Sequence, residues 1–367
     1  MKWKRGVPLV VAGLLVACTP ARPAAQVSPD PVVGSLTDYV DQAVAAERFR
    51  GAVEVRDGPK VLLRRGFGRA NPQTRVPNGP NTRFRIASVT KQFTALAVLV
   101  LQEQGRLNVA DGVCAYLTSC PPQWAPITID ELLAHTSGIH DYGAGFGSIE
   151  QFFASIGTRE PSPEQLTQLF AGLPLDFPPS TKWSYSNSGY VVLGLLIERV
   201  SGKSYGDFLH DEVLDPLGMS DTGYQPGLAP SDEYAVGYSN WTTQAPVFDD
   251  SVYYSAGGMY STVRDLGRWQ QFLLHGDTSV VQAGTVAALL RPRVAANPGT
   301  WYGYGIASRG ASIDAVTSYG HTGNIAGFNS YTEIRPATGV TVTVLANINF
   351  GIDEFGRELA ELVPKQR

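Results

Sequence analysis

Cysteine and methionine are scarce in this chain, with three of each among 367 residues. The cysteines form no Cys-x-x-Cys pair and no His-Glu-x-x-His occurs, so two common zinc-binding patterns are absent and we predict no metal and no cofactor. Charge is also low: charged residues make up 17% of the chain, the formal net charge is -4, and the basic residues form no long run. Nucleic acid is not expected as a partner, because phosphate binding needs a basic surface.

A long apolar run is missing too, and the N-terminus holds only a short one. Basic residues within positions 2–5 precede the apolar stretch Gly6–Ala17, which is too short to span a bilayer. We predict that residues 1–17 are a signal peptide. The segment Leu15-Val16-Ala17-Cys18 resembles a bacterial lipobox, which implies cleavage before Cys18 and lipidation of its thiol. The alternative is an ordinary signal peptide with an incidental cysteine.

The lipobox resemblance implies a place outside the cytoplasm, with Cys18 as a lipid anchor in a bacterial membrane. Thr19 at the next position favours the periplasmic side of the outer membrane. Residues 18–32 hold four prolines and are predicted to form a tether. In such a compartment Cys114 and Cys120 are expected to form a local disulfide; the alternative is two inert buried thiols.

Strand patterns lie at both ends of the chain and helical patterns fill its middle. Apolar or alternating segments predict strands at 52–56, 61–67, 302–307, 328–334 and 340–347. Helical spacing predicts helices at 36–44, 88–101, 129–134, 188–200, 263–274 and 352–362. The simplest architecture is an α+β fold (an α/β sandwich), with one antiparallel sheet from both chain ends, flanking helices and an inserted mainly helical region. We expect one domain at 33–367, with an α/β part at about 33–85 and 300–367 and a helical part at about 86–299.

Ser88-Val89-Thr90-Lys91 places a serine and a lysine three residues apart, on one face of a helix. Serine is a weak nucleophile until a base takes its proton, and a desolvated lysine with a lowered pKa is such a base. No other lysine of the chain follows a serine at this spacing. The pattern predicts Ser88 as a nucleophile and Lys91 as its base.

Tyr185-Ser186-Asn187 supplies a second set of side chains. A tyrosine near a lysine can act as a phenolate base, and an asparagine amide can hold the lysine or a substrate carbonyl. Tyr238-Ser239-Asn240 has the same three-residue sequence. We prefer the first copy, because it leads directly into an apolar helix that would hold it rigidly, whereas the second lies in a polar loop.

His321-Thr322-Gly323 supplies a third set. Gly323 allows a substrate to approach what we expect to be an edge strand. Thr322 offers a hydroxyl, and His321 offers a donor or a partial positive charge for a substrate carboxylate or an oxyanion. The alternative for His321 is a solvent-facing loop histidine.

In this order and separation the three motifs resemble the class C β-lactamase and DD-peptidase family of serine hydrolases. The resemblance implies a β-lactamase/transpeptidase-like fold and an acylated nucleophile at Ser88. It also implies that Lys91 and Tyr185 share the roles of general base and general acid. It also implies that Asn187 orients Lys91 and the substrate. The oxyanion hole would be the backbone N–H groups of Ser88 and Asn324.

One residue departs from the class C pattern, which usually has lysine where this chain has His321. The resemblance implies that His321, Thr322 and Gly323 line the strand side of the cleft. The His-Thr-Gly pattern looks more like that of DD-carboxypeptidases, D-amino-acid peptidases and related esterases. We expect a serine hydrolase acting on D-Ala-type peptides. The alternatives are a family VIII-like carboxylesterase on small esters and a non-catalytic binding lipoprotein. The oligomeric state stays open.

Three further polar residues could indicate a second site: His135, and His140 beside Asp141. A metal is one interpretation. Nothing else in the sequence clusters with them, so we expect structural roles.

Overall fold

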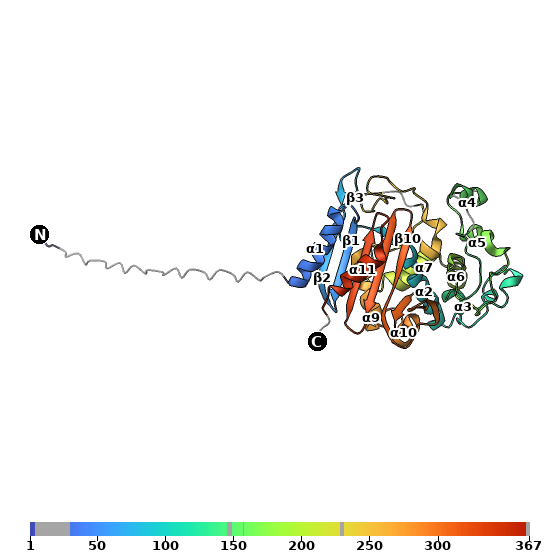
Figure 1. Cartoon of the computed structure of the whole chain (residues 1–367). Coiled ribbons are helices and arrows are strands. Elements are labelled where there is room, and N and C mark those ends of the chain that lie inside the picture. Colours follow the sequence, from blue (N-terminus) through green and yellow to red (C-terminus); the bar gives the residue numbers. More distant parts are fainter. Residues whose placement is uncertain (4–29, 145–148, 157, 228–230, 365–367) are drawn as a thin grey trace.

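The computed structural model describes residues 1–3, 30–144, 149–156, 158–227 and 231–364 (Figure 1). Most of the predicted signal peptide and tether, including Cys18, therefore lies outside the described residues. Within the described ranges, no helix combines the length and the apolar character needed to cross a membrane.

The centre of the fold is an eight-stranded antiparallel sheet with the order β2-β1-β12-β11-β10-β9-β8-β7. Its strands are β1 (Gly51–Asp57), β2 (Lys60–Phe67), β7 (Val294–Asn297), β8 (Thr300–Tyr302), β9 (Ala307–Gly310), β10 (Val316–Ile325), β11 (Phe328–Arg335) and β12 (Val340–Ala346). The two chain ends meet where β1 pairs with β12, with Gly51 opposite Ala346 and Asp57 opposite Val340. The predicted sheet from both ends of the chain is confirmed.

Helices cover both faces of this sheet (Figure 1). α1 (Pro31–Ala45) and α11 (Ile352–Glu361) pack on one face, and α9 (Val263–His275) packs on the other. Side chains alternate along a strand, so Val53 belongs to the cluster under α1 and α11 while its neighbour Ala52 belongs to the main core. α9 thus lies on the sheet, although its sequence falls in the range predicted as the helical part.

The helical region is built around α2 (Thr90–Glu103), in which residues 90–101 are all buried. This confirms the helix predicted at 88–101, but α2 begins two residues later than expected. Ser88 lies instead in η1 (Ala87–Val89), a 3-10 turn that leads into the helix. The remaining helices of eight residues or more are α4 (Ile149–Ile156), α5 (Pro163–Ala171), α6 (Asn187–Ser201) and α10 (Ala283–Leu290).

Two short helices, α3 (Ile129–Leu133) and α8 (Tyr254–Gly257), pack against the longer helices of this region. α3 begins with a capping box, in which the Thr128 and Glu131 side chains accept each other's backbone N–H groups. α8 packs against both α2 and α6. α3 also packs against α6, so both short helices contact the helix that begins at Asn187.

One predicted strand is wrong in its extent. The segment expected as a single strand at 302–307 is the turn between β8 and β9, and only its ends belong to strands. Gly305 has a φ of 67° there, and a Cβ atom at this position would lie 2.4 Å from the Lys91 carbonyl oxygen. The close approach of this turn to α2 therefore requires glycine.

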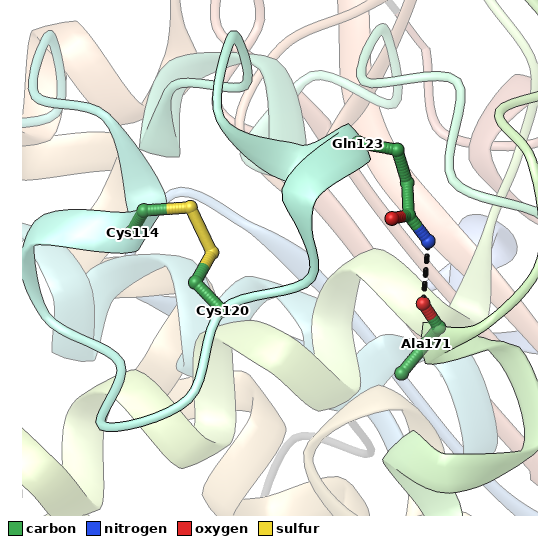
Figure 2. Close-up of a disulfide and its surroundings, with 4 residues drawn as sticks. All are labelled: Cys114, Cys120, Gln123 and Ala171. Atoms are coloured by element: carbon green, nitrogen blue, oxygen red, sulfur yellow. Dashed lines mark hydrogen bonds between the residues drawn. A yellow bond between two sulfur atoms is a disulfide. The ribbon is translucent and has the colours of Figure 1, made fainter.

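Cys114 and Cys120 form a disulfide in the structure (Figure 2). Nearby, Gln123 donates to the carbonyl of Ala171 at the end of α5 over 2.5 Å. The disulfide therefore closes a short loop next to a contact between two parts of the helical region.

Candidate active site

Ser88 and Lys91 lie side by side at the start of α2. The Lys91 Nζ atom is 3.1 Å from Ser88 Oγ. Ala87, directly before the serine, has a φ of 47°, a left-handed conformation that costs a non-glycine residue about 1–2 kcal/mol. The backbone beside Ser88 is thus held in place by its surroundings, as is common at functional sites.

Lys91 is fully buried and is surrounded by oxygen atoms. Its Nζ atom donates to Asn187 Oδ1 over 2.8 Å and to the Ala256 carbonyl in α8 over 2.6 Å. Burial lowers the pKa of Lys91 to about 7, and attraction by the charge of Asp141 opposes this shift. Much of Lys91 is therefore neutral near pH 7 and able to accept a proton.

Tyr185 approaches Ser88 from the end of the loop that precedes α6. Its hydroxyl donates to Ser88 Oγ over 2.8 Å, and its ring centroid is 4.8 Å from Lys91 Nζ. Burial raises the pKa of Tyr185, although the hydrogen bond to Ser88 works against this shift. Tyr185 is therefore a phenol at neutral pH, so the arrangement favours Lys91 over a tyrosine phenolate as the base.

Tyr238, which begins the second Tyr-Ser-Asn triplet, has different neighbours. Its hydroxyl donates to Gln73 Oε1 over 2.8 Å, and the Arg50 guanidinium lies 4.4 Å from its ring centroid. The structure brings Tyr185, and not Tyr238, to the serine.

The third motif lies in the second half of β10. β10 pairs with β11 as far as Ile325, but its pairing with β9 ends at Gly320. Within the described sheet, residues 321–325 therefore form a free edge inside a strand that is otherwise internal. A Cβ atom on Gly323 would lie 2.4 Å from the Ile86 carbonyl oxygen, so glycine lets this edge pack against the turn that carries Ser88.

His321 ends a chain of hydrogen bonds that starts in the second motif. The Ser186 N–H donates to His135 Nδ1 over 3.2 Å, so the hydrogen of this neutral ring is on Nε2, which is 3.3 Å from the Tyr302 hydroxyl. Tyr302 is 2.9 Å from His321 Nε2, and His321 Nδ1 is 2.5 Å from the Thr322 carbonyl oxygen. Because a backbone N–H can only donate, every bond of the chain runs in the same direction, towards Thr322.

Both ring nitrogens of His321 are thereby engaged within the protein. Burial lowers its pKa to about 4, and the charge of Lys91 adds to that shift. His321 is neutral at neutral pH, and the structure does not support the expectation that it offers a positive charge to a substrate. From the sequence, Tyr302 was one of several tyrosines that could line the cleft but for which packing was favoured, and only a structural role was expected for His135.

A cleft of about 600 Å³ opens at Ser88. Its lining residues are Ser88, Tyr142, Gly143, Phe152, Tyr185, Asn187, Val252, Tyr253, Ala256, Gly257, His321, Thr322, Asn324 and Ile325. The cleft joins all three predicted motifs, and it includes Asn324, whose N–H remains predicted to be part of an oxyanion hole. A smaller cavity of about 150 Å³ shares Tyr185, His321 and Thr322 with the cleft and also includes Arg309.

The other candidates lie in ordinary structural contacts. His140 pairs with Asp176 over 2.9 Å, and no group of three potential metal ligands occurs within the residues that the structure describes. Gly202–Gly206 has the Gly-x-Ser-x-Gly spelling of a nucleophile elbow, but it joins α6 to α7 (Tyr205–Leu209) rather than a strand to a helix. Ser204 there caps α7 by accepting the Asp207 N–H.

An antiparallel sheet between helical layers, with a serine, a lysine and a tyrosine in contact at its edge, defines a serine hydrolase of the β-lactamase type. The family model for Beta-lactamase matches residues 36–363, and the chain belongs to this family. Penicillin-binding protein 4* of Bacillus subtilis (strain 168) is 37% identical over 197 residues, which are 52% of this chain and 42% of that protein. The chain thus matches less than half the length of this relative.

Solved structures confirm the predicted fold class. The penicillin-binding protein from Bacillus halodurans has a TM-score of 0.78 at 26% identity, covering 89% of this chain and 99% of that one. The D-amino acid amidase from Ochrobactrum anthropi SV3, solved with L-phenylalanine, has a TM-score of 0.75 at 23% identity, covering 91% and 96%. At that identity the second likeness shows the fold alone.

Proposed function

We propose that this protein is a serine hydrolase that works through an acyl-enzyme on Ser88. The observation that carries the proposal is the position of Ser88 Oγ, 3.1 Å from Lys91 Nζ and 2.8 Å from the Tyr185 hydroxyl. A hydroxyl held between a base and a phenol suits an activated nucleophile. Membership of the Beta-lactamase family supports a hydrolase.

The contacts of Lys91 suit its neutral form as the base. Its two N–H groups are taken by Asn187 Oδ1 and the Ala256 carbonyl, which leaves the nitrogen lone pair for the Ser88 hydroxyl hydrogen. Ser88 Oγ then bonds to the substrate carbonyl carbon while its proton moves to Lys91. The carbonyl oxygen becomes an oxyanion, for which we propose the N–H groups of Ser88 and Asn324 as donors.

Tyr185 completes the cycle as the proton donor. Its hydroxyl gives a proton to the leaving group as the carbonyl re-forms, and the proton held by Lys91 restores the phenol. A water molecule then attacks the ester on Ser88, and its proton takes the reverse route, so the second half-reaction regenerates the free serine.

D-Ala-type peptides are the substrate class that we propose first. The smaller cavity, which shares Tyr185 and His321 with the cleft, includes Arg309, whose side chain is 40% exposed and pairs with Asp353 of α11 over 3.0 Å. A guanidinium is a suitable partner for a terminal carboxylate. The name of one similar protein, a penicillin-binding protein, supports the same class.

Small esters are the second candidate, and the wall of the main cleft favours them. Tyr142, Phe152, Val252, Tyr253 and Ile325 give this wall an apolar and aromatic character. An uncharged acyl or alcohol group would be buried there at little cost in desolvation.

One set of substrates separates these candidates. We would measure kcat/KM for a D-Ala-D-Ala peptide, the same peptide with a C-terminal amide, and an aryl ester, using the wild type, Ser88→Ala and Arg309→Gln. The peptidase proposal predicts that the free carboxylate is preferred and that Arg309→Gln removes this preference. Ester turnover alone, unchanged in Arg309→Gln, would favour the esterase. No Ser88-dependent turnover of any substrate would favour the non-catalytic binding protein.

We also propose that the mature protein is held at a membrane by lipid on Cys18. The sequence around Cys18 supports this proposal. Incorporation of labelled palmitate into the wild type in a bacterial host, and its loss in Cys18→Ala, is the expected result. Equal labelling of the two forms, or none in the wild type, would contradict it.

A further inference from the structure

Asp141 lies at the N-terminus of α6, next to the amide that holds Lys91. Its Oδ2 atom accepts the backbone N–H of Asn187 over 3.1 Å and the Nδ2–H of the same residue over 3.0 Å. Its Oδ1 atom accepts the Gly143 N–H over 2.7 Å. One carboxylate thus fixes both the backbone and the side chain of Asn187.

This contact decides which end of the Asn187 amide faces the lysine. Because the NH2 group binds Asp141, the oxygen Oδ1 faces Lys91 Nζ at 2.8 Å. If the amide were turned around, its NH2 group would face the N–H groups of Lys91 and its oxygen would face the carboxylate. Donor would meet donor and acceptor would meet acceptor, so Asp141 excludes that arrangement.

Asp141 also acts on Lys91 through its charge. Burial lowers the pKa of Lys91 to about 7, and Asp141 pulls it upward. The pKa of Tyr185 and of Tyr190 is raised, and that of His135 and of His321 is lowered, in each case chiefly by burial. These four titratable side chains near Lys91 are all neutral at neutral pH.

We propose that Asp141 is a positioning residue of this hydrolase, which orients the Asn187 amide and keeps a negative charge beside Lys91. The inference rests on the proposed role of Lys91 as the base of Ser88. It assigns a function to a residue that the sequence suggested only as a metal ligand or a structural group.

Asp141→Asn tests the inference, because it removes the charge and keeps the shape. We would measure kcat/KM against pH with an activated ester, counting active sites by the burst of released alcohol. Asp141 favours protonated Lys91, so its loss should move the acid limb of the profile to lower pH. The plateau per active site should fall by about 10- to 100-fold, as expected when a hydrogen bond to a charged group is lost.

Two variants make this result specific. Asp176→Asn removes an exposed carboxylate that pairs with His140, and it should leave both the limb and the plateau unchanged. Asp141→Glu keeps the charge, so its limb should stay near that of the wild type even if its plateau falls. A merely structural residue would lower stability and the number of active sites without moving the limb.

The failures can be told apart. A limb and a plateau in Asp141→Asn that match the wild type per active site would overturn the positioning role alone. A wild type without a Ser88-dependent burst would overturn the proposed function, and this inference with it.

Discussion

The Tyr302 hydroxyl lies 2.9 Å from Nε2 of His321, at the point where the main-chain pairing between β9 and β10 ends. This side-chain contact links the last residue of β8 to the free edge of β10. It engages one ring nitrogen of a histidine that lines the cleft. His321 of the third motif therefore has a structural role in the site as a neutral, hydrogen-bonded side chain, and it is not one of the charged groups of the site.

Replacing Tyr302 should change the titration of His321. The Tyr302 hydroxyl donates to the unprotonated Nε2 and so stabilises the neutral ring. In Tyr302→Phe the pKa of His321 should rise from about 4, as followed by the histidine signals in NMR spectra across pH. Tyr304→Phe, which removes a hydroxyl that donates to Asp130 instead, is the control and should leave the His321 signal unchanged.

The pH dependence of the reaction should report Lys91. Only the neutral amine accepts the Ser88 proton, and burial lowers the pKa of Lys91 to about 7. The value of kcat/KM should therefore rise with pH through about 7 and fall about tenfold per unit below it. Lys91→Ala should lose about 100-fold or more at pH 8. A flat profile from pH 5 to 8 would argue against lysine as the base.

The two tyrosines that each begin a Tyr-Ser-Asn triplet provide a matched pair. Tyr185→Phe removes the phenol that donates to Ser88 Oγ, and kcat should fall about 100-fold or more. Tyr238→Phe removes a hydroxyl that donates to Gln73, and kcat should stay within about twofold of the wild type. The reverse order of effects would mean that the site has been assigned to the wrong copy.

The disulfide should contribute to stability and not to catalysis. Cys114 and Cys120 are six positions apart, and closing so short a loop stabilises a fold by about 2 kcal/mol in the chain-entropy account. Denaturant unfolding of the Cys114→Ser/Cys120→Ser double variant should show a loss of this size. Its kcat/KM should match that of the wild type, and a large loss of activity per folded molecule would contradict this division.

The sequence was most informative where a motif is local. Ser88 and Lys91 are three residues apart, so the local backbone of a 3-10 turn leading into α2 brings them together. The sheet was also predictable, because strand patterns at both ends of the chain have few ways to bury their apolar faces. The capping box at Thr128 is local in the same way, because its two partners are three residues apart in the chain.

Contacts between distant segments could not be predicted in this way. Asp141 binds Asn187, which lies 46 residues further along the chain. His135 contacts Tyr302, which lies 167 residues further along. The neutral state of His321 depends on burial by residues from several elements, which no local pattern encodes. The turn at Gly305 was missed because a continuous β-like pattern concealed the close approach of the backbone to α2.

The central claim is that Ser88 becomes acylated, and intact mass spectrometry tests it most directly. The soluble form lacking residues 1–18 would be mixed with a penicillin, or separately with an activated ester under rapid acid quench, and the modified residue located by peptide mapping. We expect a mass increase equal to the acyl group, located on Ser88 and absent in Ser88→Ala. An adduct on another residue, or Ser88→Ala turning over the ester as fast as the wild type, would contradict the account.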